Sequence, residues 1–199
     1  DGRVAAAWFR RAEIPFLLPR VAGLRALVVA RCRYGAELAG LIAAARAKGV
    51  PVLFDCDDLI FDTRHTHLVM QTLGQSAGTD HAMDFWFAQI ARLEAAARLC
   101  DGGITTNETL AGHMREVVPG PVAVVPNFLN RRQQEISGLL LRAKRESGWR
   151  GDGITRIGYF SGTPSHNNDF AVAAPALARL LERDPGVRLW SVGWLDVLG

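Results

Sequence analysis

The sequence predicts an α/β protein in which an open parallel sheet, with helices on both faces, is followed by the start of a second, similar domain. Short apolar runs alternate with segments of helical periodicity, and this alternation is typical of a parallel sheet covered by helices. The same alternation begins again after a glycine-containing segment at 151–153. With 199 residues, of which 49% are apolar, the chain can build one large domain or two small ones.

The first predicted domain covers residues 1–126, contains three βα units and is expected to lack its first strands. Its helix at 35–48 has apolar residues at helical spacing and is followed by Gly49, which fits the C′ position of a helix end. Thr105 and Glu108 have the spacing of a capping box, which predicts a helix from Thr105 to about Val117. A third helix is expected at 80–99, and the strands are expected at 26–30, 51–54, 103–105 and 122–125.

A polar linker at 127–153 is expected to contain a helix that opens near Arg131 and ends near Gly148. The second domain, 154–199, then begins with a strand at 154–160, a polar loop at 161–168, a helix at 170–182 and a strand at 187–192. Two strands provide little area to cover the apolar face of a helix. We therefore expect residues 154–199 to expose an apolar patch or to pack against a partner chain. The chain is expected to be a fragment of a longer protein.

Composition excludes several classes of function. The net charge of +3 is too weak to indicate a nucleic-acid partner. No apolar run approaches the roughly 20 residues of a membrane span. The three cysteines, Cys32, Cys56 and Cys100, lie in apolar segments, which predicts buried free thiols in a reducing compartment. No Cys/His cluster is visible in the sequence, which argues against a zinc site.

The first candidate for chemistry is Asp55-Cys56-Asp57-Asp58, at the carboxyl end of a predicted strand, where open α/β sheets bind ligands. Three carboxylates this close repel one another unless a metal, a cationic substrate group or helix N-termini compensate them. Asp capping of the next turn is the plain structural interpretation. The motif also resembles the haloacid-dehalogenase phosphatases, with Asp55 as nucleophile and Asp57 as acid/base, or the metal-binding Asp-x-Asp of a single-domain sugar transferase.

The second candidate is the loop 161–169 between a strand and a helix. Gly162 permits close backbone approach, and the hydroxyls of Ser161, Thr163 and Ser165 donate to phosphate oxygens. The helix that follows adds free N–H groups, so the loop suits a diphosphate, with His166 as a further anion contact. The alternative is a polar turn in which Asn168 or Asp169 caps the helix.

Taken in order, several segments resemble the family 4-like glycosyltransferases of the two-domain GT-B fold, in which both domains are Rossmann-like. The resemblance covers the central portion of such an enzyme, roughly half of it. The usual glycine-rich loop near the N-terminus and the glutamate that holds the donor ribose are not found. The segments that carry the resemblance are 51–62, 101–108, 122–127, 157–166 and 189–193.

The resemblance implies transfer of a sugar from a nucleotide-sugar to a glycan or lipid-linked acceptor, with no metal or cofactor required. Gly162, Thr163, Ser165 and His166 would face the donor diphosphate, and Asp57 and Asp58 would face the acceptor or donor sugar across the interdomain cleft. The enzyme is expected in the cytoplasm, at the inner face of the membrane, and this chain alone is expected to have no turnover. The competing class is a non-catalytic α/β binding module.

Overall fold

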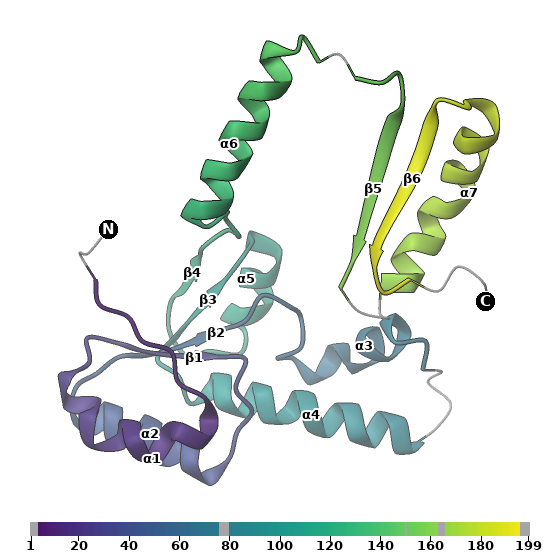
Figure 1. The fold of residues 1–199 in the computed structure, drawn as a ribbon. Coiled ribbons are helices and arrows are strands. Elements are labelled where there is room, and N and C mark those ends of the chain that lie inside the picture. The colour runs from purple at the N-terminus through teal and green to yellow at the C-terminus, as the bar shows by residue number, and fades with distance from the viewer. Residues whose placement is uncertain (1–3, 76–79, 150, 163–165, 196–199) are drawn as a thin grey trace. The chain divides into compact units, whose positions relative to one another are not determined.

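The computed structural model describes residues 4–75, 80–149, 151–162 and 166–195. The chain forms two compact units (Figure 1). Unit 1 comprises Asp1–Met70 with Ala77–Asn127, and unit 2 comprises Gln71–Ser76 with Phe128–Gly199.

Unit 1 is built on a parallel sheet of four strands in the order β1-β2-β3-β4. In register, Val29 lies beside Phe54, Phe54 beside Gly103, and Gly103 beside Val122. The sheet confirms the predicted α/β class, with each strand close to its expected position. The strands are β1 (Leu27–Ala30), β2 (Val52–Asp55), β3 (Gly102–Thr105) and β4 (Val122–Val124).

The helices between these strands also form where the periodicity predicts them. Gly49 has a φ of +70°, as expected after the end of α2. Two helical stretches were not predicted: one precedes β1, and the other follows β2. The helices of unit 1 are η1 (Arg11–Glu13), α1 (Ile14–Leu17), η2 (Leu18–Gly23), α2 (Ala36–Ala47), η3 (Thr63–His65), α3 (Thr66–Thr72), α4 (Asp80–Arg98) and α5 (Glu108–Arg115), and the last two residues of α3 belong to unit 2.

The start of α5 differs from the prediction. Its N-cap is Asn107, whose side-chain oxygen accepts a hydrogen bond from the Leu110 N–H at 2.9 Å. Thr105 instead ends β3, and its buried hydroxyl donates to the Cys56 carbonyl at 2.8 Å. The capping-box prediction was wrong because the strand pairing of β3 engages Thr105.

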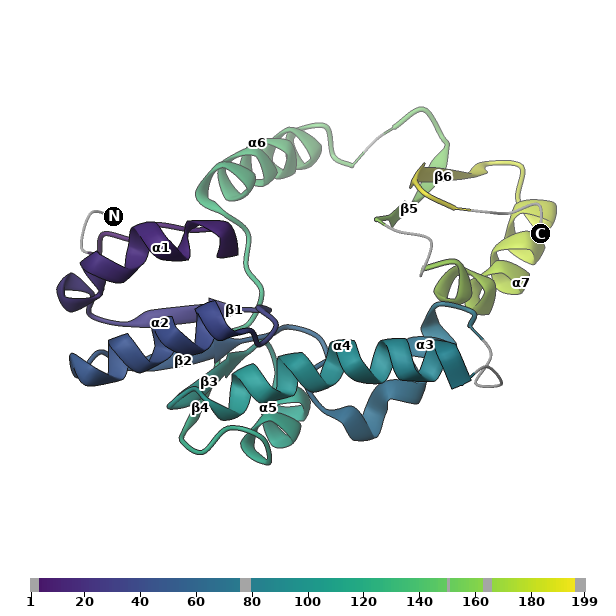
Figure 2. The ribbon, with the colours of Figure 1, turned by 90° about the horizontal axis from the view of Figure 1, so that it is seen from below.

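The two faces of the sheet are covered to different extents. On one face, Val29 and Phe54 belong to a core that also takes in buried residues of α1, η2, α2, α4 and α5. On the other face, Val28 is 49% exposed and Leu53 is half-buried. Figures 1 and 2 show α2 and α4 against the same side of the sheet. Right-handed crossovers that always step in one direction, as the strand order requires, place their helices on one face.

Unit 2 contains a helix, α6 (Arg131–Glu146), and one βαβ unit: β5 (Thr155–Ser161), α7 (Asn167–Arg183) and β6 (Val187–Gly193). β5 and β6 pair in parallel along their whole length. Among the described side chains of α7, that of Phe170 is buried. Its ring packs edge-on against the ring of Tyr159, with the two ring centroids 4.9 Å apart. Large apolar side chains are exposed in this segment, as expected, at Phe160, Val172, Trp190 and Val192.

The cysteines give a test of the core. All three are free; Cys56 and Cys100 are buried, whereas Cys32 is only partly so. Burial raises the pKa of Cys56 to about 11 and that of Cys100 to about 12. Because only thiolates react, we expect a disulfide reagent at pH 8 to label Cys32 first and the other two only on unfolding. Mass spectrometry of the labelled peptides checks this order; early labelling of Cys100 would contradict the packing.

Candidate functional site

In unit 1, polar side chains gather at the carboxyl ends of β1 and β2. Arg31 follows β1, and Asp57 and Asp58 follow β2 within three residues of its end. The Arg31 Nη1 donates to Asp57 Oδ1 at 3.0 Å, and its Nη2 lies 2.8 Å from Asp58 Oδ2. One guanidinium therefore holds two carboxylates at the edge of the sheet where α/β proteins bind ligands.

The backbone of Arg31 is unusual. Its φ is +44°, in the left-handed region that side chains other than glycine rarely adopt. Its N–H still donates to the Asp55 carbonyl at 2.9 Å, so the sheet pairing continues to this residue. Such a conformation costs on the order of 1 kcal/mol and is concentrated at functional sites. Here it accompanies a side chain that reaches the acidic loop.

The other two members of the acidic motif are less exposed. Burial, followed by the charge of Asp57, raises the pKa of Asp55, and Arg31 partly offsets both effects. The Cys56 thiol is buried and donates to the Asp58 carbonyl at 3.3 Å. The motif thus presents Asp57 and Asp58 to solvent, whereas Asp55 is partly buried and Cys56 is buried.

Compensation of the acidic motif comes from the chain itself. The sequence predicted that a metal, a cationic substrate group or helix N-termini would balance these carboxylates; the structure supplies the Arg31 guanidinium. Arg31 was not among the predicted site residues. The sequence did contain a signal for this role, namely a basic residue directly after a predicted buried strand. The carboxyl ends of parallel strands lie at the same edge of the sheet, so such a residue comes close to the acidic residues that follow the next strand.

This arrangement gives a prediction for Mg²⁺. Because Arg31 already pairs with Asp57 and Asp58, we expect millimolar MgCl₂ to shift the melting temperature by less than about 1 °C. A NaCl control of equal ionic strength separates screening from binding. A rise of several degrees with Mg²⁺ alone would instead favour the phosphatase or the metal-dependent transferase interpretation.

The strain at Arg31 gives a second prediction. Substitution Arg31→Gly relieves the left-handed backbone but removes two ion pairs between side chains that are about half exposed. Such pairs contribute roughly 0–1 kcal/mol each, so we expect the free energy of unfolding to change by less than about 1 kcal/mol. Urea denaturation measures it. A loss above about 2 kcal/mol would make Arg31 a structural residue.

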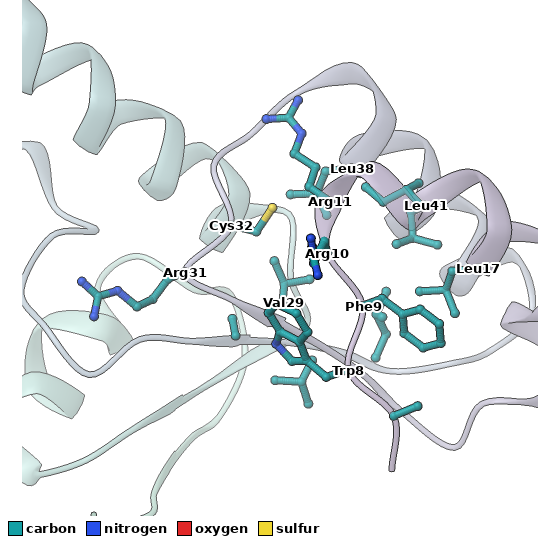
Figure 3. A pocket seen from close by; sticks show the side chains of 15 residues that line it. Trp8, Phe9, Arg10, Arg11, Leu17, Val29, Arg31, Cys32, Leu38 and Leu41 are labelled. Atoms are coloured by element: carbon teal, nitrogen blue, oxygen red, sulfur yellow. The ribbon is translucent and has the colours of Figure 1, made fainter.

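A cavity of about 340 Å³ lies beside β1 (Figure 3). Its walls come from the N-terminal segment, α1, β1 and α2, and most of the labelled side chains that line it are apolar. Arg31 lines its rim, and Figure 3 shows its side chain directed away from the apolar residues. The apolar lining residues labelled there are Trp8, Phe9, Leu17, Val29, Leu38 and Leu41.

In unit 2, the predicted phosphate loop is described at its two ends. Thr163 and Ser165 lie outside the described residues. Gly162 follows β5 directly, is exposed and does not have a left-handed φ; a Cβ added there meets no described atom within 4 Å. A side chain at Gly162 is therefore expected to add no backbone strain. Ser161, in contrast, is buried as the last residue of β5.

His166 is the N-cap position of α7, so Asn168 and Asp169 lie inside the first turn rather than capping it. The His166 Nδ1 lies 3.0 Å from Asp169 Oδ2, and its carbonyl accepts a hydrogen bond from the Tyr159 hydroxyl at 2.9 Å. The N-terminus of this 17-residue helix favours an anion. The negative charge of Asp169, in the first turn of α7, opposes the binding of an anion there.

No family model, no curated protein and no solved structure matches this chain. Among the helices that the structure describes, none is both long and apolar enough to cross a membrane.

Proposed function

We propose that this chain is part of a GT-B glycosyltransferase, which transfers a sugar from a nucleotide-sugar to a glycan or lipid-linked acceptor. The observation that carries the proposal is that each unit has its own parallel strands with polar residues at their carboxyl ends. These residues are Arg31, Asp57 and Asp58 in unit 1 and His166 in unit 2, where the exposed Gly162 precedes His166 in the same loop. Carboxyl ends of parallel strands are where such folds bind nucleotides and their substrates.

The donor diphosphate is assigned to unit 2. The exposed Gly162 leaves its backbone open to a ligand, and the first turn of α7 offers N–H groups. His166 contributes a ring whose Nδ1 is paired with Asp169, which orients the other nitrogen. Stabilisation of the departing diphosphate is the main catalytic contribution of these groups. Thr163 and Ser165 belong to the same proposed site.

The sugar is assigned to unit 1. Asp57 and Asp58 have side chains about half exposed, and their carboxylate oxygens accept hydrogen bonds from sugar hydroxyls. Arg31 fixes both carboxylates from one side. Their role is positioning, which raises the rate by holding the reacting groups in a productive geometry.

A lipid-linked acceptor suits the surface of α6. Spacings of three and four residues place Ile136, Leu139 and Leu140 on one face, and all three are exposed. Basic side chains occupy other positions of the same helix, a composition that favours anionic membrane surfaces. They are Arg131, Arg132, Arg142, Lys144 and Arg145. The proposed location is the cytoplasm, at the inner face of the membrane.

Isothermal titration calorimetry of the chain with a panel of nucleotide-sugars and free nucleoside diphosphates tests this function. We expect saturable binding of at least one nucleotide-sugar, and we expect the matching nucleoside diphosphate to compete with it. Competition by the nucleoside diphosphate would show that the chain recognises the nucleotide and its phosphates and not the sugar alone. Absence of heat with every donor would favour the non-catalytic binding module.

A further inference from the structure

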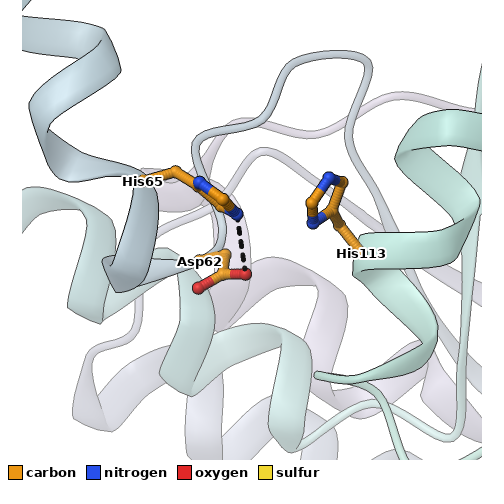
Figure 4. Close-up of side chains that lie close together, drawn as sticks. All are labelled: Asp62, His65 and His113. Atoms are coloured by element: carbon orange, nitrogen blue, oxygen red, sulfur yellow. Dashed lines mark ion pairs between the residues drawn. The ribbon is translucent and has the colours of Figure 1, made fainter.

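Unit 1 contains a second polar cluster, which the sequence does not reveal. Asp62, His65 and His113 each offer one ligand atom, and these atoms all lie within 4.8 Å of one another. Asp62 is the N-cap of η3 and His65 is the last residue of η3, whereas His113 comes from α5. Figure 4 shows the two imidazole rings and the carboxylate turned toward one space.

The contacts within this cluster are close. The His65 Nε2 lies 3.6 Å from Asp62 Oδ2, and the rings of His65 and His113 meet edge-on with their centroids 4.8 Å apart. The Asp62 side chain is only 3% exposed, whereas that of His65 is 25% exposed. The cluster therefore has a buried carboxylate at its base and an open side through which a ligand can enter.

The core holds both segments in place. Phe61, next to Asp62, is fully buried and packs edge-on against Phe54. Met114, next to His113, is also fully buried. The loop is further fixed by Glu94 of α4, whose Oε2 accepts hydrogen bonds from the Thr63 N–H at 3.0 Å and hydroxyl at 2.9 Å. Ligand side chains fixed in this way bind a metal with little reorganisation.

We propose that Asp62, His65 and His113 form a binding site for a divalent transition metal, with Zn²⁺ as the best fit. Imidazole nitrogens with a carboxylate oxygen are ligands that Zn²⁺ favours, and three protein ligands leave a fourth position open. Bond lengths of about 2.1 Å place two tetrahedral ligands about 3.4 Å apart. The Asp62–His65 separation of 3.6 Å is close to this value. The other separations are at most 4.8 Å, so the side chains need to close by no more than about 1.4 Å when a metal binds. This inference does not rest on the proposed transferase.

Arg64 is the competitor for the site. Its Nε donates to Asp62 Oδ1 at 2.9 Å and its Nη2 to Asp62 Oδ2 at 2.6 Å. The same Nη2 lies 2.6 Å from Glu116 Oε2. The guanidinium therefore retains an ion pair with Glu116 when Asp62 coordinates a metal. The Arg64 side chain is largely exposed, which lets it move aside. Metal and Arg64 therefore compete for one carboxylate.

The test is titration of the tag-free chain with Zn²⁺, followed by calorimetry, and with Co²⁺, followed by its visible absorption. We expect one ion per chain and the intense absorption of tetrahedral Co²⁺. His65→Ala and His113→Ala should each weaken Zn²⁺ binding by at least about 100-fold. Removal of a residue that only supports a metal ligand costs about 10- to 100-fold in affinity, and removal of a ligand itself should cost at least as much. Arg64→Gln should strengthen it, because the competing cation is removed.

His67→Ala and His81→Ala are the matched controls. His67 is the exposed neighbour of the site, with its ring centroid 6.3 Å from that of His65, and His81 lies in α4. Both should leave the affinity unchanged, and circular dichroism confirms that each variant is folded. The proposal is overturned if the unaltered chain binds no Zn²⁺, if His67→Ala weakens binding as much as His113→Ala, or if Arg64→Gln weakens it.

Discussion

Phe54→Ala is expected to destabilise unit 1 by about 3–5 kcal/mol, a large fraction of the roughly 5–15 kcal/mol that stabilise a typical domain. Phe54 is fully buried at the centre of the sheet, and its ring meets that of Phe61 edge-on at 6.3 Å. Truncation leaves a cavity between β2 and the covering helices and removes this contact. The shift in the urea midpoint measures this loss of stability. Amide hydrogen exchange in β2 serves as the probe, so that the unfolding of unit 1 is observed separately from that of unit 2.

The neighbouring strand residue provides the control. Leu53 points to the opposite face of the sheet, where it is only half-buried, and Val28 on the same face is 49% exposed. We expect Leu53→Ala to cost less than half as much as Phe54→Ala, and Val28→Ala to cost under about 1 kcal/mol. Equal losses at Leu53 and Phe54 would show that both faces are packed alike, contrary to the burial described above.

Gly162→Val is expected to weaken nucleotide-sugar binding at least about tenfold, which corresponds to roughly 1.4 kcal/mol. Its backbone is not left-handed, and an added Cβ has no described neighbour within 4 Å, so we expect no change in stability. A weaker affinity therefore reports directly on a ligand that approaches the backbone of Gly162. Calorimetry gives the affinity, and thermal melting gives the stability.

Gly151→Val is the matched substitution, because Gly151 also belongs to unit 2, has no left-handed φ and has open space around its Cβ position. It should leave the affinity unchanged. If Gly162→Val binds the donor as well as the unaltered chain, the diphosphate lies elsewhere and the transferase proposal loses its donor site.

Local patterns determined most of the secondary structure. Apolar runs predicted β1 to β6 and helical spacing predicted α2, α4 and α7, because side-chain periodicity reflects the face that an element buries. The helix α6 was predicted from the polar composition of residues 127–153. The glycine at position 49 predicted the end of α2, because the residue after a helix often has a positive φ, which few residues other than glycine adopt. The short helices before β1 and after β2 were missed because they are too short for periodicity to appear.

The sites depended on contacts between segments that lie far apart in the chain. The acidic residues at 55–58 were visible as a motif, yet their partner Arg31 is defined only when β1 pairs with β2. His65 and His113 come together only when α5 packs beside the loop that carries Asp62. Sequence specifies residue types and local periodicity; the sheet order and the direction of its crossovers decide which polar side chains meet and which face stays open.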